Sequence, residues 1–172
     1  MMGTGRIHMY YGDGKGKTTA AVGQAVRAAG AGLQVLFFQF LKDNSSNERK
    51  ILESVPGITC LPGRDQVKFV SRMNGDEKAE LRHYNNKALD EIVKFCTNFD
   101  VLVLDESLCA IHLNVLSEEK IRSFLEHKPR GLEIIMTGHK VSQDLLDLAD
   151  YATMMMKVKH PYDRKVQARE GI

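Results

Sequence analysis

Residues 7–21 read Ile7-His8-Met9-Tyr10-Tyr11-Gly12-Asp13-Gly14-Lys15-Gly16-Lys17-Thr18-Thr19-Ala20-Ala21. An apolar stretch leads into a glycine-rich turn, and a segment of small residues follows the turn. Backbone N–H groups in such a turn point inward around phosphate oxygens, and the N-terminus of the following helix adds a partial positive charge. This is the layout of a phosphate-binding P-loop, so the sequence predicts a site for a nucleoside triphosphate.

The loop itself supplies most of the predicted nucleotide ligands. They are Gly12, Asp13, Gly14, Lys15, Gly16, Lys17, Thr18 and Thr19. Lys17 brings a mobile positive charge to the phosphates, and the Thr18 hydroxyl is placed to ligate Mg²⁺. The match is a variant, because the leading glycine is Gly12 whereas the full pattern requires it at Tyr11. The alternative interpretation is a glycine-rich turn between a strand and a helix, with no ligand.

The composition is that of an ordinary globular domain. The chain has 172 residues, of which 43% are apolar and 27% charged, and its formal net charge is +2. We therefore expect one domain over residues 1–172, with no nucleic-acid or membrane partner. No signal peptide or membrane-spanning apolar run is recognisable, and we expect a cytoplasmic protein. The three cysteines form no Cys-x-x-Cys pair, which favours free thiols.

Strand-like and helix-like segments alternate along the chain. The expected strands are residues 7–11, 34–40, 58–61, 100–105, 132–136 and 151–158. The expected helices are residues 19–31, 48–54, 76–98 and 142–149, with a further helix that begins at Ser117. Strands separated by helices of this length indicate a parallel sheet. We therefore expect the α/β fold of a RecA-like P-loop NTPase, with a mostly parallel sheet flanked by helices in three layers.

Acidic residues stand at the end of one expected strand. Ligands of parallel α/β sheets bind beyond the carboxyl ends of the strands. Asp105 and Glu106 follow four apolar residues there, and an acid facing a P-loop is a common second anchor for Mg²⁺. The predicted metal ligands are therefore Thr18, Asp105 and Glu106. Which of the two carboxylates contacts the ion is left open, and Asp105 could instead cap the next turn.

Further polar residues follow the second expected strand. Gln39, Lys42, Glu48 and Arg49 are candidates for binding nucleotide or substrate, and the alternative for each is a helix cap or a surface charge. Residues 64–75 have little periodicity and are expected to form a loop over the site. No side chain stands out as a base that would activate water. This favours a reaction in which the nucleophile arrives with the substrate.

Four stretches together resemble one family, the ATP:corrinoid adenosyltransferases of the P-loop type, which act in vitamin B12 synthesis and salvage. The first is the variant P-loop at residues 12–21. The others are Gln39-Phe40-Leu41-Lys42 with Asn47-Glu48-Arg49, then Val103-Leu104-Asp105-Glu106, and finally residues 144–150, 158–163 and 167–172 of the tail. The tail, with Lys159-His160-Pro161-Tyr162 and Gly171-Ile172, is more specific than the P-loop.

The resemblance implies a reaction and a set of ligands. A Co(I) corrinoid attacks the 5′ carbon of ATP, and triphosphate leaves. ATP, Mg²⁺ and a corrinoid (cobalamin, cobinamide or cobyrinic acid a,c-diamide) are the implied ligands, with Lys17, Thr18 and Glu106 as catalytic residues. Phe69 stands where the family places an aromatic side chain against the corrin ring. The family also implies an electron-donating flavoprotein partner and a homodimer.

Two other functions remain open at the level of sequence. One is another P-loop enzyme, an ATPase or a nucleoside kinase. The other is a non-catalytic relative that binds ATP or corrinoid, because the chain departs from the family pattern at Val67, at His139 and at residues 154–156.

Overall fold

Six parallel strands form one sheet, in the order β3-β2-β4-β5-β1-β6. The computed structural model describes residues 3–167 and 169–171. The strands are β1 (Ile7–Tyr11), β2 (Val35–Gln39), β3 (Ile58–Cys60), β4 (Val101–Asp105), β5 (Glu133–Gly138) and β6 (Tyr151–Met154). The parallel sheet predicted from the sequence is confirmed, and its last strand is shorter than expected.

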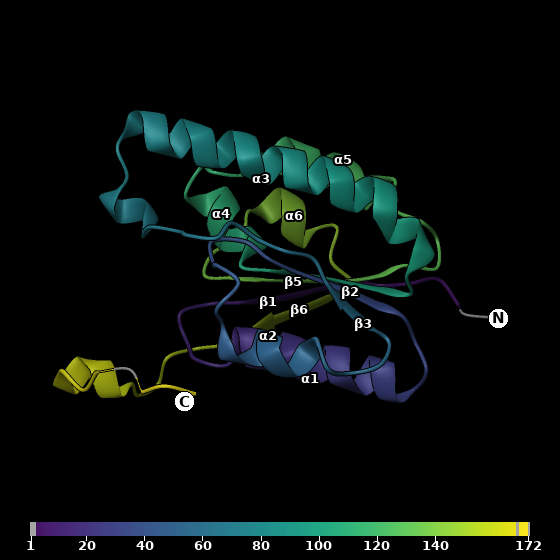
Figure 1. Ribbon diagram of the computed structural model, residues 1–172, viewed down its shortest axis with the longest axis horizontal. Helices are drawn as coiled ribbons and strands as arrows, with labels where there is room; N and C mark the ends of the chain where they lie inside the picture. Colours follow the sequence, from purple (N-terminus) through teal and green to yellow (C-terminus); the bar gives the residue numbers. More distant parts are fainter. Residues whose placement is uncertain (1–2, 168, 172) are drawn as a thin grey trace.

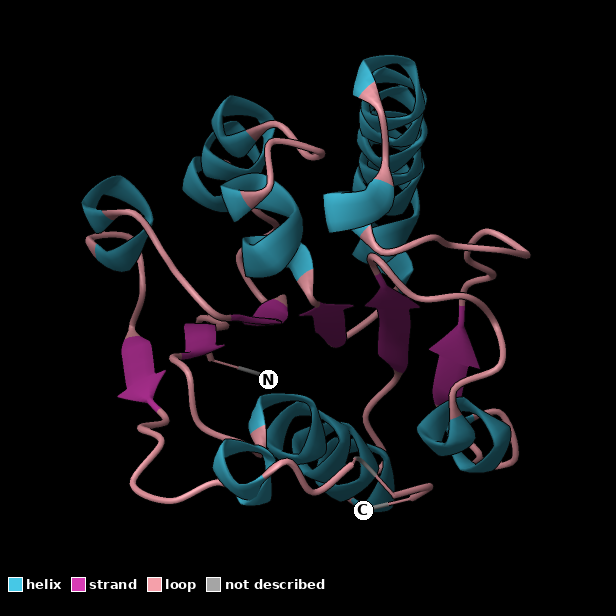
Figure 2. Ribbon diagram, turned by 90° about the vertical axis from the view of Figure 1, so that its left-hand side faces the viewer, coloured by secondary structure: helices cyan, strands magenta, loops and turns pink. Residues whose placement is uncertain are grey.

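Helices cover both faces of the sheet (Figures 1 and 2). α1 (Lys17–Gly30) and α2 (Asn47–Leu52) lie on one face. The other face carries α3 (Gly75–Phe95), α4 (Ser107–His112), α5 (Glu118–Glu126) and α6 (Gln143–Leu146). Short 3₁₀ turns are formed by Val70–Arg72, Cys96–Asn98 and Pro161–Arg164. The three-layer α/β arrangement, with a parallel sheet between two layers of helices, agrees with the prediction.

The central strands alternate their side chains between two cores, as the period of a strand requires. Val35 and Phe37 of β2 join the core under α1 and α2. Leu36 and Phe38 join the core under α3 and α5. Because both faces are covered, these strands read as continuous apolar runs. On α1 the residues that meet the sheet are alanines, which let the helix lie close to it; they are Ala21, Ala25 and Ala28.

Several helix boundaries differ from the sequence-based expectation. α3 ends at Phe95, and the three residues after it form a 3₁₀ turn. Its start is fixed by a capping box, in which Asn74 and Glu77 satisfy each other's backbone N–H groups. α4 was not predicted, because six residues are too few to show a helical period. Ser117 caps α5 as predicted, by accepting the N–H of Lys120.

None of the helices in the described part of the chain is both long and apolar enough to cross a bilayer.

The core under α1 and α2 gives a direct stability prediction. Phe37 is 0% exposed, so Phe37→Ala should lower the free energy of unfolding by about 3–5 kcal/mol, measured by urea denaturation. Ile51→Ala on α2 is the control, because Ile51 is 65% exposed and its loss should change stability by about 0.5 kcal/mol or less. Equal effects of the two substitutions would contradict this description of the core.

Candidate functional site

The P-loop adopts a backbone that glycine alone fits easily. Gly12 and Gly16 both have φ of 113°, in the region that L side chains rarely adopt. A Cβ at Gly12 would lie 2.4 Å from the carbonyl oxygen of Met155, which follows β6. Gly14 is also confined, because a Cβ there would lie 2.8 Å from that same oxygen, to which its N–H donates. The displaced first glycine is therefore required by the packing of the loop against the end of β6.

The Lys17 side chain folds back and hydrogen-bonds to the backbone of its own loop. Its ammonium group donates to the carbonyl oxygen of Gly14 at 2.6 Å, and the residue is 9% exposed. The ammonium thus lies in the hollow that the loop surrounds. Lys15 in the same loop is exposed.

Asp105 is at the centre of the hydrogen-bond network of the site. It ends β4, is 0% exposed, and its two carboxylate oxygens accept four hydrogen bonds. Oδ1 accepts from Thr18 Oγ1 at 2.9 Å and from Thr137 Oγ1 at 2.7 Å. Oδ2 accepts from Gln39 Nε2 at 3.0 Å and from Lys42 Nζ at 3.1 Å. One buried carboxylate therefore joins the P-loop helix, the end of β2 and the end of β5.

Lys42 and Glu48 extend this network toward α2. The Lys42 ammonium lies 3.0 Å from Glu48 Oε1, which also accepts from Gln39 Nε2 at 2.8 Å. Burial alone would lower the pKa of Lys42, but the carboxylates of Asp105 and Glu48 outweigh it and raise that pKa above its usual value. Burial also opposes ionisation of Glu48, yet the hydrogen bonds from Gln39 and Lys42 hold its pKa below the usual value. Both side chains are therefore charged at neutral pH.

Glu106 has an unusual backbone conformation. Its φ is 59°, in the left-handed region, and it forms the N-cap position of α4. Its N–H donates to Thr137 Oγ1 at 2.8 Å. A left-handed residue other than glycine costs about 1–3 kcal/mol and is concentrated at functional sites. This conformation turns the chain so that the Glu106 side chain faces the open space beyond the sheet.

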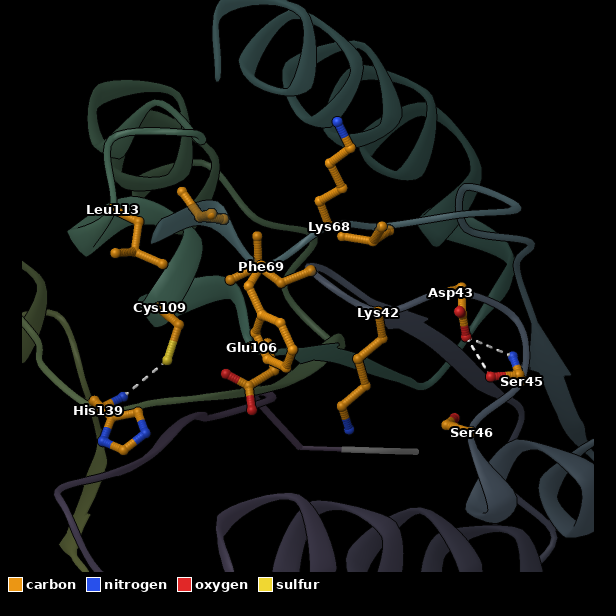
Figure 3. A pocket seen from close by; sticks show the side chains of 13 residues that line it. Lys42, Asp43, Ser45, Ser46, Lys68, Phe69, Glu106, Cys109, Leu113 and His139 are labelled. Carbon is orange, nitrogen blue, oxygen red and sulfur yellow. Dashed lines mark hydrogen bonds between the residues drawn. The ribbon is translucent and has the colours of Figure 1, made fainter. Parts of the chain in front are cut away.

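Two cavities lie at the carboxyl ends of the strands. The P-loop cavity measures about 640 Å³. It is lined by Lys15, Gly16, Lys17, Thr18, Thr19, Val22, Lys42, Asn47, Glu48, Glu106, His139 and Gly171. The outer cavity measures about 540 Å³ (Figure 3). It is lined by Leu41, Lys42, Asp43, Ser45, Ser46, Val67, Lys68, Phe69, Val70, Glu106, Cys109, Leu113 and His139. Lys42, Glu106 and His139 line both, so the two cavities meet at these residues.

Arg49 and Gln39, two of the predicted binding residues, line neither cavity. Arg49 is 5% exposed, and its guanidinium binds the Glu53 carboxylate and the carbonyl oxygens of Cys60 and Leu61. Gln39 is buried and acts within the Asp105 network, with its oxygen accepting from Ser46 Oγ at 2.7 Å. Nucleotide contact by Arg49 and Gln39 stays a prediction, and the structure gives each of them contacts that hold neighbouring segments together.

Asp13 and Phe69 also have defined surroundings. The Asp13 carboxylate accepts the N–H of Lys157 at 3.0 Å, a hydrogen bond that lowers the pKa of Asp13. Phe69 lies in the expected loop at residues 64–75 and is 76% exposed. The Arg72 guanidinium stands 5.7 Å from the centroid of its ring. Phe69 is thus an aromatic surface facing the outer cavity, available to a flat ligand.

Two side chains that line the site, Cys109 and His139, were not among the predicted binding or catalytic residues. Cys109 lines the outer cavity, and burial raises the pKa of its thiol to about 12. His139 directly follows Gly138, the last residue of β5. Because its neighbours in space come from the P-loop and α4, only the tertiary structure shows that it lies between the cavities.

The oxygen donors beside the P-loop suit a hard cation. Mg²⁺ is typically bound through one or two protein oxygens together with phosphate oxygens and water. Thr18 donates its hydroxyl proton to Asp105, which leaves its oxygen lone pairs free, and the Glu106 carboxylate lines the same cavity. No cluster of three His, Cys, Asp or Glu residues that could hold a metal without a nucleotide occurs within residues 3–167 and 169–171. The residues present therefore fit a nucleotide-bound Mg²⁺.

Comparisons with known proteins identify similar chains. The family model described as ATP:corrinoid adenosyltransferase BtuR/CobO/CobP matches residues 3–172. The corrinoid adenosyltransferase CobA of Salmonella typhimurium is 33% identical over 177 residues, covering 98% of this chain and 85% of that protein. The corrinoid adenosyltransferase of Escherichia coli K12 is 32% identical with the same coverage. A KaiC-like protein structure from Pyrococcus horikoshii aligns with 90% of this chain and 73% of its own, with 19% identity and a TM-score of 0.47.

The confined first glycine of the P-loop gives a testable consequence. Gly12→Ala places a Cβ against Met155 O and forces an alanine into a left-handed backbone, so ATP affinity should fall by about tenfold or more in isothermal titration calorimetry. Gly23→Ala on α1 is the matched control, because nothing lies within 4 Å of its added Cβ. The control should keep full ATP affinity, and a Gly12→Ala protein that does the same would show that the loop geometry is not required.

Proposed function

We propose, since this chain belongs to the ATP:corrinoid adenosyltransferase family, that it transfers the 5′-deoxyadenosyl group of ATP to the Co(I) centre of a reduced corrinoid. The electron pair of Co(I) forms the new bond to the 5′ carbon. The bond between that carbon and its oxygen breaks, and triphosphate leaves with the bonding electron pair. The observation that carries the proposal is the meeting of two cavities at Lys42, Glu106 and His139.

In this proposal the P-loop cavity holds the triphosphate. Lys17 exchanges its hydrogen bond with the Gly14 carbonyl for one with a phosphate oxygen, and Lys15 adds a second charge from the exposed side of the loop. Positioning and neutralising the departing polyanion is the main task of the protein, because cobalt brings its own electron pair. No protein base is needed for this step.

Mg²⁺ is part of the proposed nucleotide complex. Thr18 and Glu106 supply the oxygen atoms that hold it, and when bound it neutralises charge on the phosphates. Asp105 acts chiefly on Thr18, because its four accepted hydrogen bonds occupy both carboxylate oxygens. This assigns the inner contact to Glu106 and an orienting role to Asp105. Lys17, Thr18 and Glu106 are then the residues that touch the reacting nucleotide or its ion.

The outer cavity is the proposed place of the corrinoid. Its apolar lining suits the face of a large ring, and it is formed by Leu41, Val67, Phe69, Val70 and Leu113. Phe69 lies on the loop at residues 64–75, which covers this cavity, and its ring is exposed there (Figure 3). We assign to Phe69 the displacement of the lower axial ligand, because a cobalt ion without that ligand is easier to reduce.

The proposal includes partners that act outside the two cavities. Reduction of the corrinoid to Co(I) needs an electron donor, and a flavoprotein is the donor that we propose. We also propose a homodimer in the cytoplasm. Cross-linking and size-exclusion chromatography test the oligomeric state, and reconstitution with a reduced flavoprotein tests electron delivery.

The activity is tested anaerobically with the protein, MgATP and chemically reduced Co(I) cobinamide. We expect the Co(I) absorbance band to disappear as a light-sensitive adenosyl product forms. Lys17→Ala should abolish both ATP binding and this product, because it removes the charge at the centre of the loop. Persistence of the Co(I) band with the unaltered protein, despite tight ATP binding, would contradict the proposal and favour a binding protein.

The role of Phe69 is tested by comparing two corrinoids. Phe69→Ala should slow adenosylation of cobalamin about three- to tenfold more than that of cobinamide, which lacks the lower ligand. Phe95→Ala is the control, because Phe95 is also part-exposed and packs near Phe99, away from both cavities. An equal loss with both corrinoids in Phe69→Ala would remove the axial-ligand role.

A further inference from the structure

His139 stands where the reacting bond has to lie. The triphosphate and the corrinoid occupy different cavities in the proposed function, yet the 5′ carbon must reach cobalt. The bond that breaks is therefore near the junction of the cavities, which Lys42, Glu106 and His139 form. In Figure 3 these three side chains lie along one side of the outer cavity, with Glu106 between the other two.

The backbone of His139 is held from two sides. Its N–H donates to the Sγ atom of Cys109 on α4 at 3.2 Å, and its carbonyl oxygen accepts the N–H of Gly12 at 3.0 Å. The preceding Gly138 packs so closely on α4 that a Cβ there would lie 2.5 Å from the Cys109 nitrogen. The Cα of His139 is thus fixed relative to both the P-loop and α4.

The side chain of His139, in contrast, has its donors free. Among the described residues, no hydrogen bond or ion pair is formed by its exposed imidazole. The Lys42 ammonium at the same junction is already paired with Asp105 and Glu48. Glu106 is an acceptor when ionised and cannot donate to a phosphate. His139 is therefore the side chain of the junction that can offer an uncommitted hydrogen-bond donor.

We propose that the His139 imidazole donates a hydrogen bond to the phosphate group that is released from the 5′ carbon. This inference rests on the proposed function. As the carbon–oxygen bond breaks, its electron pair stays on the phosphate oxygen, and that oxygen gains charge beside His139. The imidazole keeps its proton and stabilises the charge through the hydrogen bond. An interaction that grows as the bond breaks lowers the barrier, whereas one made equally with ATP does not.

The proposal predicts a difference between two ligands that do not need cobalt. In ATP the oxygen beside the 5′ carbon is an ester oxygen, and in inorganic triphosphate it is a free anionic oxygen. His139 should therefore contribute more to the binding of inorganic triphosphate than to the binding of ATP. Loss of a hydrogen bond to a charged group corresponds to about a tenfold loss of affinity or more.

The first test is isothermal titration calorimetry without corrinoid. His139→Ala should weaken binding of Mg-triphosphate about tenfold and change MgATP affinity by no more than about twofold. Lys140→Ala is the matched control, because it truncates the exposed polar side chain next to His139 in the sequence, and Lys140 lines neither cavity. His139→Arg should restore triphosphate binding. Unchanged triphosphate affinity in His139→Ala, or an equal loss for ATP, would overturn the proposal.

Steady-state kinetics with Co(I) cobinamide give a second test. His139→Ala should lower kcat about tenfold with little change in the KM for the corrinoid, and His139→Arg should recover most of the rate. A rise in that KM with kcat unchanged would instead assign His139 to the corrinoid and overturn the proposal. Failure of the unaltered protein to adenosylate any corrinoid would contradict the proposed function, whereas the calorimetric comparison would still test His139 as a triphosphate ligand.

Discussion

The buried carboxylate of Asp105 is the constraint on which the site depends. A charge that is 0% exposed is costly unless hydrogen bonds and an opposite charge compensate it. Here the compensation comes from four donors on separate segments: Thr18 at the start of α1, Gln39 at the end of β2, Lys42 beyond it, and Thr137 on β5. Loss of Asp105 would release all four, so the carboxylate fixes both the P-loop helix and the wall of the junction.

The chemistry of the site depends on the groups around Asp105 that remain available to ligands. Thr18 keeps its lone pairs for an ion, and the adjacent Glu106 turns into the open space through its left-handed backbone. Lys42 is held in place by two carboxylates, while His139 keeps its donors available. The protein therefore has a binding site for a polyanion next to an apolar surface. That combination suits a reaction in which a strong nucleophile arrives with its substrate and the leaving group carries several charges.

Much of this arrangement was predictable from the sequence because it is encoded locally. The P-loop at residues 12–19 and the strand that ends in Asp105 are contiguous patterns, and the apolar runs of the central strands require a sheet covered on both faces. α4 was not predicted because its six residues, which directly follow Asp105 and Glu106, are too few to show a helical period. The structural contacts of Arg49 and the junction position of His139 depend on segments distant in sequence, which no local pattern reveals.

The fate of the phosphates tests the account most directly. Phosphorus-31 NMR of an anaerobic reaction with Co(I) cobinamide distinguishes transfer from the 5′ carbon from attack at phosphorus. The account predicts inorganic triphosphate in an amount equal to the adenosylated corrinoid, with all three phosphorus atoms still joined. Conversion of ATP to ADP, with phosphate released or passed to another acceptor, would contradict it and identify a different P-loop enzyme.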